Sequence, residues 1–150
     1  MVSEYTEHVP FEIGVKLKEY GYWNPGCTYE SSYNGPCYFK TKRFYKDGVI
    51  ANWNDITPAP TYAEVIDWFV NEKRIIIILE PFFTYSLNGN IAYNWKIYYL
   101  DKELGLVLRT EEDEWDSSKG YGGSFKLTAN AAIESAMTVK SSFEEVKINT

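Results

Sequence analysis

The sequence contains one histidine, His8, and two cysteines, Cys27 and Cys37, among its 150 residues. A Ser-His-Asp or Cys-His catalytic scheme needs His8, which lies in residues 1–9, a segment that we expect to be a loose arm. The three side chains match no zinc spacing and lack a fourth ligand. We therefore expect no metal, no cofactor and no enzymatic activity. A small enzyme with carboxylate chemistry is a third hypothesis, for which no catalytic pair can be named.

Long apolar runs are also missing. The longest, Ile75–Leu79, is far too short to span a membrane. The N-terminus has no basic residues followed by an apolar run, so we expect no signal peptide and no membrane contact. The sequence predicts a cytoplasmic location. Cys27 and Cys37 are close enough in sequence for a disulfide, but reduced thiols are the expectation in that compartment.

A basic surplus, which is typical of nucleic-acid-binding proteins, is absent. The chain has 15 basic and 21 acidic residues and a net charge of −6. Acidic residues are dense at 111–116, around Trp115, without the spacing of a calcium loop. We expect a solvated acidic loop there, and the alternative is a charged surface that mimics nucleic acid or meets a basic partner.

Aromatic residues, in contrast, make up 17% of the chain. They fit either an aromatic-rich sheet or a contact surface. The N-terminal third places several of them beside turns rich in Tyr, Ser, Asn and Gly, a composition typical of binding surfaces. Core packing is the open alternative. The predicted partner-binding residues are Tyr22, Trp23, Tyr29, Tyr33 and Trp53.

Two elements are predicted before residue 60. Residues 10–20 have helical spacing of apolar side chains, with Pro10 in the first turn and Gly21 after the end. Residues 38–45 and 49–53 flank Lys46-Asp47-Gly48, which predicts a β-hairpin because Asp-Gly adopts the positive φ angles of a tight turn.

A capping box at Thr61–Glu64 predicts the start of a helix that ends near 72–74. Its buried stripe is Tyr62, Val65, Ile66 and Phe69. Ile75–Leu79 is apolar on both faces and predicts a central strand.

Two further strands are expected at 91–99 and 106–109, joined by a turn at 101–105, and a last helix is capped by Thr128. Its predicted inward residues are Ala132, Ile133, Ala136, Val139 and Phe143. The order is α-β-β-β-α, preceded by a helix and a hairpin. We predict a single α+β domain over residues 1–150, with helices on one face of an antiparallel sheet.

Three motifs carry a resemblance to a known group: residues 60–69 (PTYAEVIDWF), the Ala-rich residues 131–136, and residues 17–22 (LKEYGY) with Pro36-Cys37. The chain resembles small uncharacterised proteins from phages and mobile elements of gut bacteria over about two thirds of its length. It departs from them between Tyr22 and Pro36. The resemblance implies genomic context and fold, and no activity.

The same element order looks like a double-stranded RNA-binding domain, whose final helix begins with lysines. Residues 128–132 contain none, so RNA binding does not follow. The nearest approach to a nucleic-acid strip is Lys40, Lys42, Arg43 and Lys46, interleaved with aromatic residues. Lysines that protect an edge hairpin explain it equally well.

The leading hypothesis is a non-enzymatic interaction module that binds an unidentified protein through the aromatic N-terminal segment. The alternative is a nucleic-acid-binding accessory protein that uses the Lys40–Lys46 hairpin. The sequence does not indicate an oligomeric state.

Overall fold

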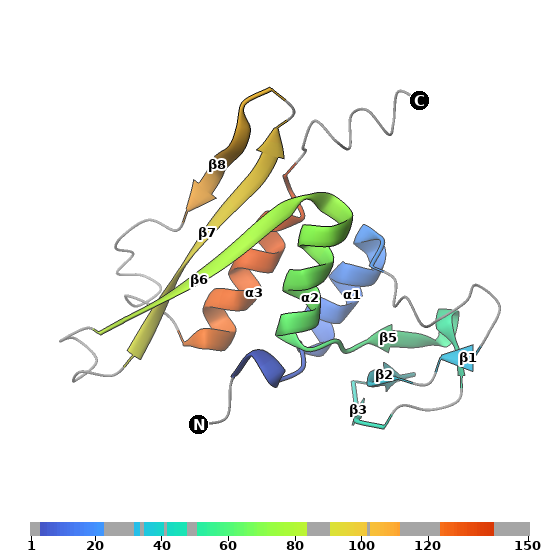
Figure 1. Ribbon diagram of the computed structural model, residues 1–150. Helices are drawn as coiled ribbons and strands as arrows, with labels where there is room; N and C mark the ends of the chain where they lie inside the picture. The colour runs from blue at the N-terminus through green and yellow to red at the C-terminus, as the bar shows by residue number, and fades with distance from the viewer. Residues whose placement is uncertain are drawn as a thin grey trace. The chain divides into compact units, whose positions relative to one another are not determined.

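The computed structural model describes residues 4–22, 32–33, 35–40, 42–47, 51–83, 91–101, 103–111 and 124–139. The chain divides into two compact units, Met1–Val65 and Ile66–Thr150. Helices occur together with antiparallel sheets, which confirms the α+β class (Figure 1). That residues 1–150 form a single domain stays a prediction.

The first unit combines helices with two small antiparallel sheets, ordered β1-β4 and β3-β2-β5 (Figure 1). Helix α1 packs against β5, the outer strand of the larger sheet. The elements are η1 (Glu4–Thr6), α1 (Phe11–Tyr20), β1 (Ser32–Tyr33), β2 (Cys37–Phe39), β3 (Phe44–Tyr45), β4 (Ala51–Asn52), η2 (Trp53–Asp55), β5 (Ile56–Pro58) and the start of α2 (Tyr62–Trp68).

The predicted first helix is confirmed as α1, which ends in a Schellman motif. Gly21 has a φ of 115°, a left-handed conformation that glycine adopts without strain. Its N–H donates to the carbonyls of Leu17 and Lys18, and the N–H of Tyr22 donates to Leu17 at 2.8 Å. These bonds satisfy carbonyls that the helix end leaves open.

The prediction of a loose arm over residues 1–9 is wrong for the part that the structure describes. The Val9 N–H donates to the Pro60 carbonyl at 2.9 Å, and the Tyr62 N–H donates to the Glu7 carbonyl at 3.0 Å. His8 forms an antiparallel bridge with Thr61 between them. We call this contact of residues 7–9 with 60–62 the N-terminal clasp. Non-local backbone bonds hold the arm, and sequence periodicity does not reveal them.

The predicted hairpin of 38–45 with 49–53 is also wrong. Tyr38 pairs with Phe44, so the chain reverses between β2 and β3 and forms the hairpin β2–β3 instead. Lys40 has a φ of 58°, which the predicted strand does not allow. Strand β4 pairs with β1, and β2 gains β5 on its other side.

The capping box is confirmed. The Glu64 N–H donates to Thr61 Oγ1 at 3.2 Å, and the Thr61 N–H donates to Glu64 Oε1 at 3.1 Å. Tyr62, Val65 and Phe69 are buried as predicted, whereas Ile66 is half-buried. After Trp68 the helix continues as a π-helix, η3 (Phe69–Lys73), which ends at Arg74 with a φ of 56°. The sequence pattern did not indicate this change of winding.

The second unit contains a three-stranded antiparallel sheet of order β6-β7-β8, built from β6 (Ile75–Phe83), β7 (Ile91–Asp101) and β8 (Gly105–Glu111). All three strands were predicted, but among the described strands β6 lies at the edge of the sheet, so its predicted central place is wrong. Ile75, Ile77 and Leu79 are buried, whereas the residues between them are half-buried or exposed. Continuous apolar character therefore does not mean burial on both faces here.

Helix α3 (Phe125–Ala136) packs on β7 and β6 (Figure 1). Ser124 is its N-cap and accepts from the Leu127 N–H, so the predicted cap at Thr128 is wrong. Thr128 lies one turn inside the helix, and its hydroxyl donates to the Tyr93 carbonyl of β7 at 3.1 Å. Ala132, Ile133, Ala136 and Val139 are buried as predicted, and Phe143 lies outside the described residues.

A turn predicted at 101–105 is confirmed between β7 and β8. Asp101 Oδ1 accepts from the N–H groups of Glu103 and Leu104 at 2.8 and 2.9 Å. The bond from Leu104, followed by that from Glu103, holds the pKa of the Asp101 carboxyl below its usual value. Gly105 follows with a φ of 78°, as such turns require.

A close helix-to-strand contact organises the first unit at Gly14. A Cβ atom added there would collide with the backbone oxygen of Pro58 and lie 2.9 Å from Thr57 Cγ2. The absence of a side chain at Gly14 is therefore what lets α1 lie directly on β5.

We predict that Gly14→Ala lowers the free energy of unfolding by about 1–3 kcal/mol, because overpacking outweighs the higher helix propensity of alanine. Urea unfolding measures the change. Glu19→Ala, at an exposed position of the same helix, should stay within about 0.5 kcal/mol of the wild type. Equal stability of Gly14→Ala and the wild type would show that α1 and β5 are not in close contact.

Candidate functional site

Two of the five predicted partner-binding aromatics, Tyr22 and Trp53, have side chains that the structure describes, and both are buried. Tyr22 and Trp53 are 5% and 8% exposed, so their rings pack in the core of the first unit. Tyr33 lies in β1 with no description of its side chain, and Trp23 and Tyr29 lie outside the described residues. The aromatic segment thus offers no described ring for a partner.

The burial of Tyr22 has a signal in the sequence. In a Schellman motif the residue after the left-handed glycine contacts the last turn of the helix through an apolar side chain. Leu17 stands four positions before Gly21, and Tyr22 follows it. The glycine that ends the helix therefore also indicates that the next aromatic residue is buried.

Lys18 fixes the position of Trp53. Its Nζ donates to the carbonyls of Trp53 and Ile56, both at 2.6 Å, and lies 5.3 Å from the centre of the Trp53 ring. Burial lowers the pKa of Lys18, and the negative charge of Asp55 acts in the opposite direction. The ammonium group serves as an internal cap for η2, which is a structural role.

We predict that Lys18→Met lowers the free energy of unfolding by about 2 kcal/mol, because two carbonyl groups lose a charged donor. Lys16→Met, an exposed position on the same helix, is the matched control and should change stability by less than about 0.5 kcal/mol. Urea unfolding of both variants decides the point. Similar losses in the two variants would contradict the role assigned to Lys18.

The β2–β3 hairpin, residues 37–46, is the candidate functional site, and Lys40, Lys42, Arg43 and Lys46 all lie in it. These four basic side chains are exposed. The Phe44 ring is 38% exposed, and Tyr45 is half-buried. The hairpin thus presents four positive charges within a short segment of a chain whose net charge is −6.

An aromatic cluster holds the hairpin on the N-terminal residues. The Phe44 ring lies 5.0 Å from the His8 imidazole and 5.6 Å from the Tyr38 ring, measured between centroids. Tyr38 meets Phe11 edge to face at 5.5 Å, and its hydroxyl donates to the Val9 carbonyl at 2.8 Å. His8 Nδ1 donates to the Ala59 carbonyl at 2.6 Å. His8 is thus a structural member of this cluster.

Three of the cations lie over aromatic rings of the same unit. The charged groups of Lys40, Lys42 and Arg43 lie 5.1, 5.9 and 5.4 Å from the centroids of Phe39, Phe11 and Tyr45. Such contacts restrict the long side chains while their charged ends stay at the surface. Lys42 also lies 3.7 Å from Glu12, an exposed ion pair of little energetic consequence.

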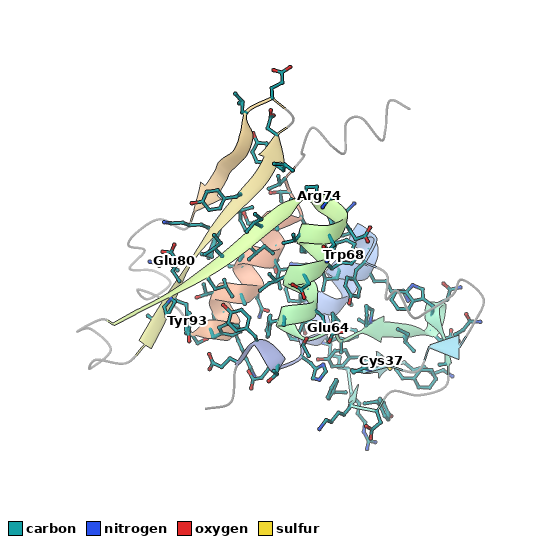
Figure 2. All side chains as sticks on the ribbon, viewed as in Figure 1. Cys37, Glu64, Trp68, Arg74, Glu80 and Tyr93 are labelled. Atoms are coloured by element: carbon teal, nitrogen blue, oxygen red, sulfur yellow. The ribbon has the colours of Figure 1, made fainter. Side chains whose placement is uncertain are left out.

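The hairpin also contains Cys37, a buried thiol on β2 (Figure 2). Cys27 lies outside the described residues, as do residues 112–116 of the predicted acidic loop, whereas Glu111 ends β8. Within the described ranges, no group of three or more His, Cys, Asp or Glu side chains is arranged to hold a metal ion. None of the helices there combines the length and apolar character needed to cross a membrane.

Comparisons with protein-family models, curated proteins and solved structures give no match for this chain.

Burial raises the pKa of the Tyr38 phenol above its usual value of 10.0, and the negative charge of Glu12 raises it further. Above about pH 10 the unfolded phenol ionises while the folded one stays protonated, so this group makes folding less stable as the pH rises. We predict that Tyr38→Phe costs about 1 kcal/mol near pH 7, through the lost hydrogen bond to Val9. The cost should shrink above about pH 10.

Urea unfolding at the two pH values measures this difference. Tyr99→Phe, in the second unit, controls for the loss of a phenol elsewhere in the chain. A stability difference for Tyr38→Phe that does not change with pH would contradict the assigned environment of the phenol.

Proposed function

We propose that this chain is a non-enzymatic interaction module that binds an acidic segment of another protein through the β2–β3 hairpin. One observation carries the proposal: four exposed cations, Lys40, Lys42, Arg43 and Lys46, are presented on a hairpin that an aromatic cluster holds in place. Because the hairpin is positioned before the partner arrives, less ordering is needed on binding. We therefore propose this hairpin as the binding surface, in place of the aromatic segment predicted from sequence.

Carboxylates suit this surface better than nucleobases do. A single-stranded nucleic acid stacks its bases on open aromatic faces. Here Phe39, Phe11 and Tyr45 each have a cation over the ring, so stacking requires displacement of that cation. Carboxylates approach the same cations from the solvent side and leave the cation–ring contacts in place.

The negative net charge of the chain favours a short acidic ligand over a long polyanion. A long polyanion would meet the repulsion of the other acidic side chains, since the net charge is −6. A short acidic segment experiences mainly the local field of the hairpin, because exposed charges more than about 10 Å apart are screened at physiological salt. An origin in phages or mobile elements rests on the sequence resemblance alone and belongs to the same proposal.

The test measures the binding of a fluorescent peptide of alternating Asp and Glu by anisotropy. The variant combines Lys40→Asn, Lys42→Ser and Arg43→Ser, with Asn at position 40 because it tolerates a positive φ. A control variant carries Lys16→Ser, Lys73→Ser and Lys126→Ser, which changes the net charge equally. We expect the hairpin variant to raise Kd about tenfold or more and the control about twofold or less.

An oligothymidine of similar charge is measured in parallel. The proposal expects it to bind more weakly than the peptide. Tighter binding of oligothymidine, lost in the hairpin variant, would support the nucleic-acid alternative and overturn the peptide proposal. Equal loss of peptide binding in the hairpin and control variants would show that net charge, and not the hairpin, attracts the ligand.

A further inference from the structure

The second unit has an edge strand with exposed apolar residues. Among the described strands, β6 pairs with β7 on one side, and no strand lies on its other side. Ile78 is 36% exposed and Ile76 is half-buried, both on the face opposite to the buried Ile75, Ile77 and Leu79. Edge strands of this length and character pair readily with other strands unless they are protected.

The residues along this edge are self-complementary about Ile77. Arg74 lies immediately before β6 and Glu80 lies further along it, as Figure 2 shows. Both are three positions from Ile77, and only isoleucine and leucine stand between them. Reversing the strand about Ile77 therefore places a cation opposite an anion and apolar residues opposite one another.

We propose that two copies of this chain associate edge to edge through β6, antiparallel, with Ile77 opposite Ile77. The two three-stranded sheets then form one continuous sheet. Ile76 of one copy faces Ile78 of the other, and Arg74 faces Glu80. Two-fold symmetry repeats each of these contacts, as in most closed homodimers.

This register is favoured over its neighbours. A shift of one residue places the buried face of one copy beside the open face of the other. A shift that centres the pairing on Ile78 puts Ile76 opposite Glu80, and one that centres it on Ile76 brings Glu80 towards Glu72. Pro81 limits the pairing at the other end, because it has no N–H to donate to a partner strand.

The two charged groups are available for the contact. Both residues are exposed, and no ion pair of Arg74 occurs among the described residues. Glu80 lies 3.3 Å from Lys96 of β7 within the same copy. A carboxylate accepts several hydrogen bonds at once, so Glu80 keeps acceptor capacity for the guanidinium of a second copy.

The experiment is sedimentation equilibrium of the full chain and of charge-reversed variants, up to about 0.5 mM protein. The variants are Arg74→Glu, Glu80→Arg and the double swap. We expect the wild type to dimerise. Each single reversal should raise the dimer Kd about tenfold or more, because it creates like-charge pairs twice per dimer. The double swap should restore the Kd to within about threefold, because it re-forms both pairs in the opposite sense.

Glu103→Arg, an exposed position in the β7–β8 turn, has the same charge change as Glu80→Arg and should leave the Kd unchanged. Circular dichroism verifies that each variant folds, and Arg74→Glu tests the edge without disturbing Lys96. A monomeric wild type over the whole range overturns the proposal. A dimer Kd that the single reversals leave unchanged also overturns it, as does a Kd that the double swap does not restore.

Discussion

The arrangement of the first unit depends on the N-terminal clasp, in which residues 7–9 form a short antiparallel bridge with residues 60–62. The bridge ends where the capping box begins, so it fixes the start of α2. Residues 7–9 of the clasp also contact the hairpin: the Val9 carbonyl accepts a hydrogen bond from the Tyr38 hydroxyl, and the His8 ring contacts Phe44. The clasp is thus the common support of a helix start and of the basic hairpin. The exposed cations have a defined position because the hairpin that carries them is bonded to the backbone of the clasp.

Local signals were sufficient for the parts of the fold that they define completely. The Thr61–Glu64 capping box, the glycine after α1 and the turn at Asp101 each satisfy backbone groups within a few residues, so the sequence around them determines the structure. The long strand β7 was found for a related reason, because its eleven residues leave room for an alternating pattern. Strand β6 was found from its continuous apolar run, Ile75–Leu79.

Prediction failed where the structure depends on pairing between distant residues. Strands β2, β3 and β4 have two or three residues each, too few for a periodic pattern. Strand β2 pairs with both β3 and β5, whereas β4 pairs with β1. A strong Asp-Gly turn signal therefore suggested the wrong hairpin. The exposure of single side chains depends on the tertiary structure in the same way. Tyr22 and Phe44 look equally suitable as contact residues in sequence, and only the tertiary structure shows that the former is buried and the latter exposed.

The basic hairpin and the β6 edge differ in the physical origin of their specificity. The hairpin would act through exposed cations, so salt should weaken its contacts steeply, and its geometry depends on distant residues such as His8 and Phe11. The edge would act through backbone hydrogen bonds, and the Arg74–Glu80 ion pairs would select the register. Salt should therefore weaken the preference for one register more than the strand pairing itself. The self-complementary pattern of the edge lies within seven consecutive residues, 74–80. It can therefore be recognised in the sequence once β6 is known to be an edge strand.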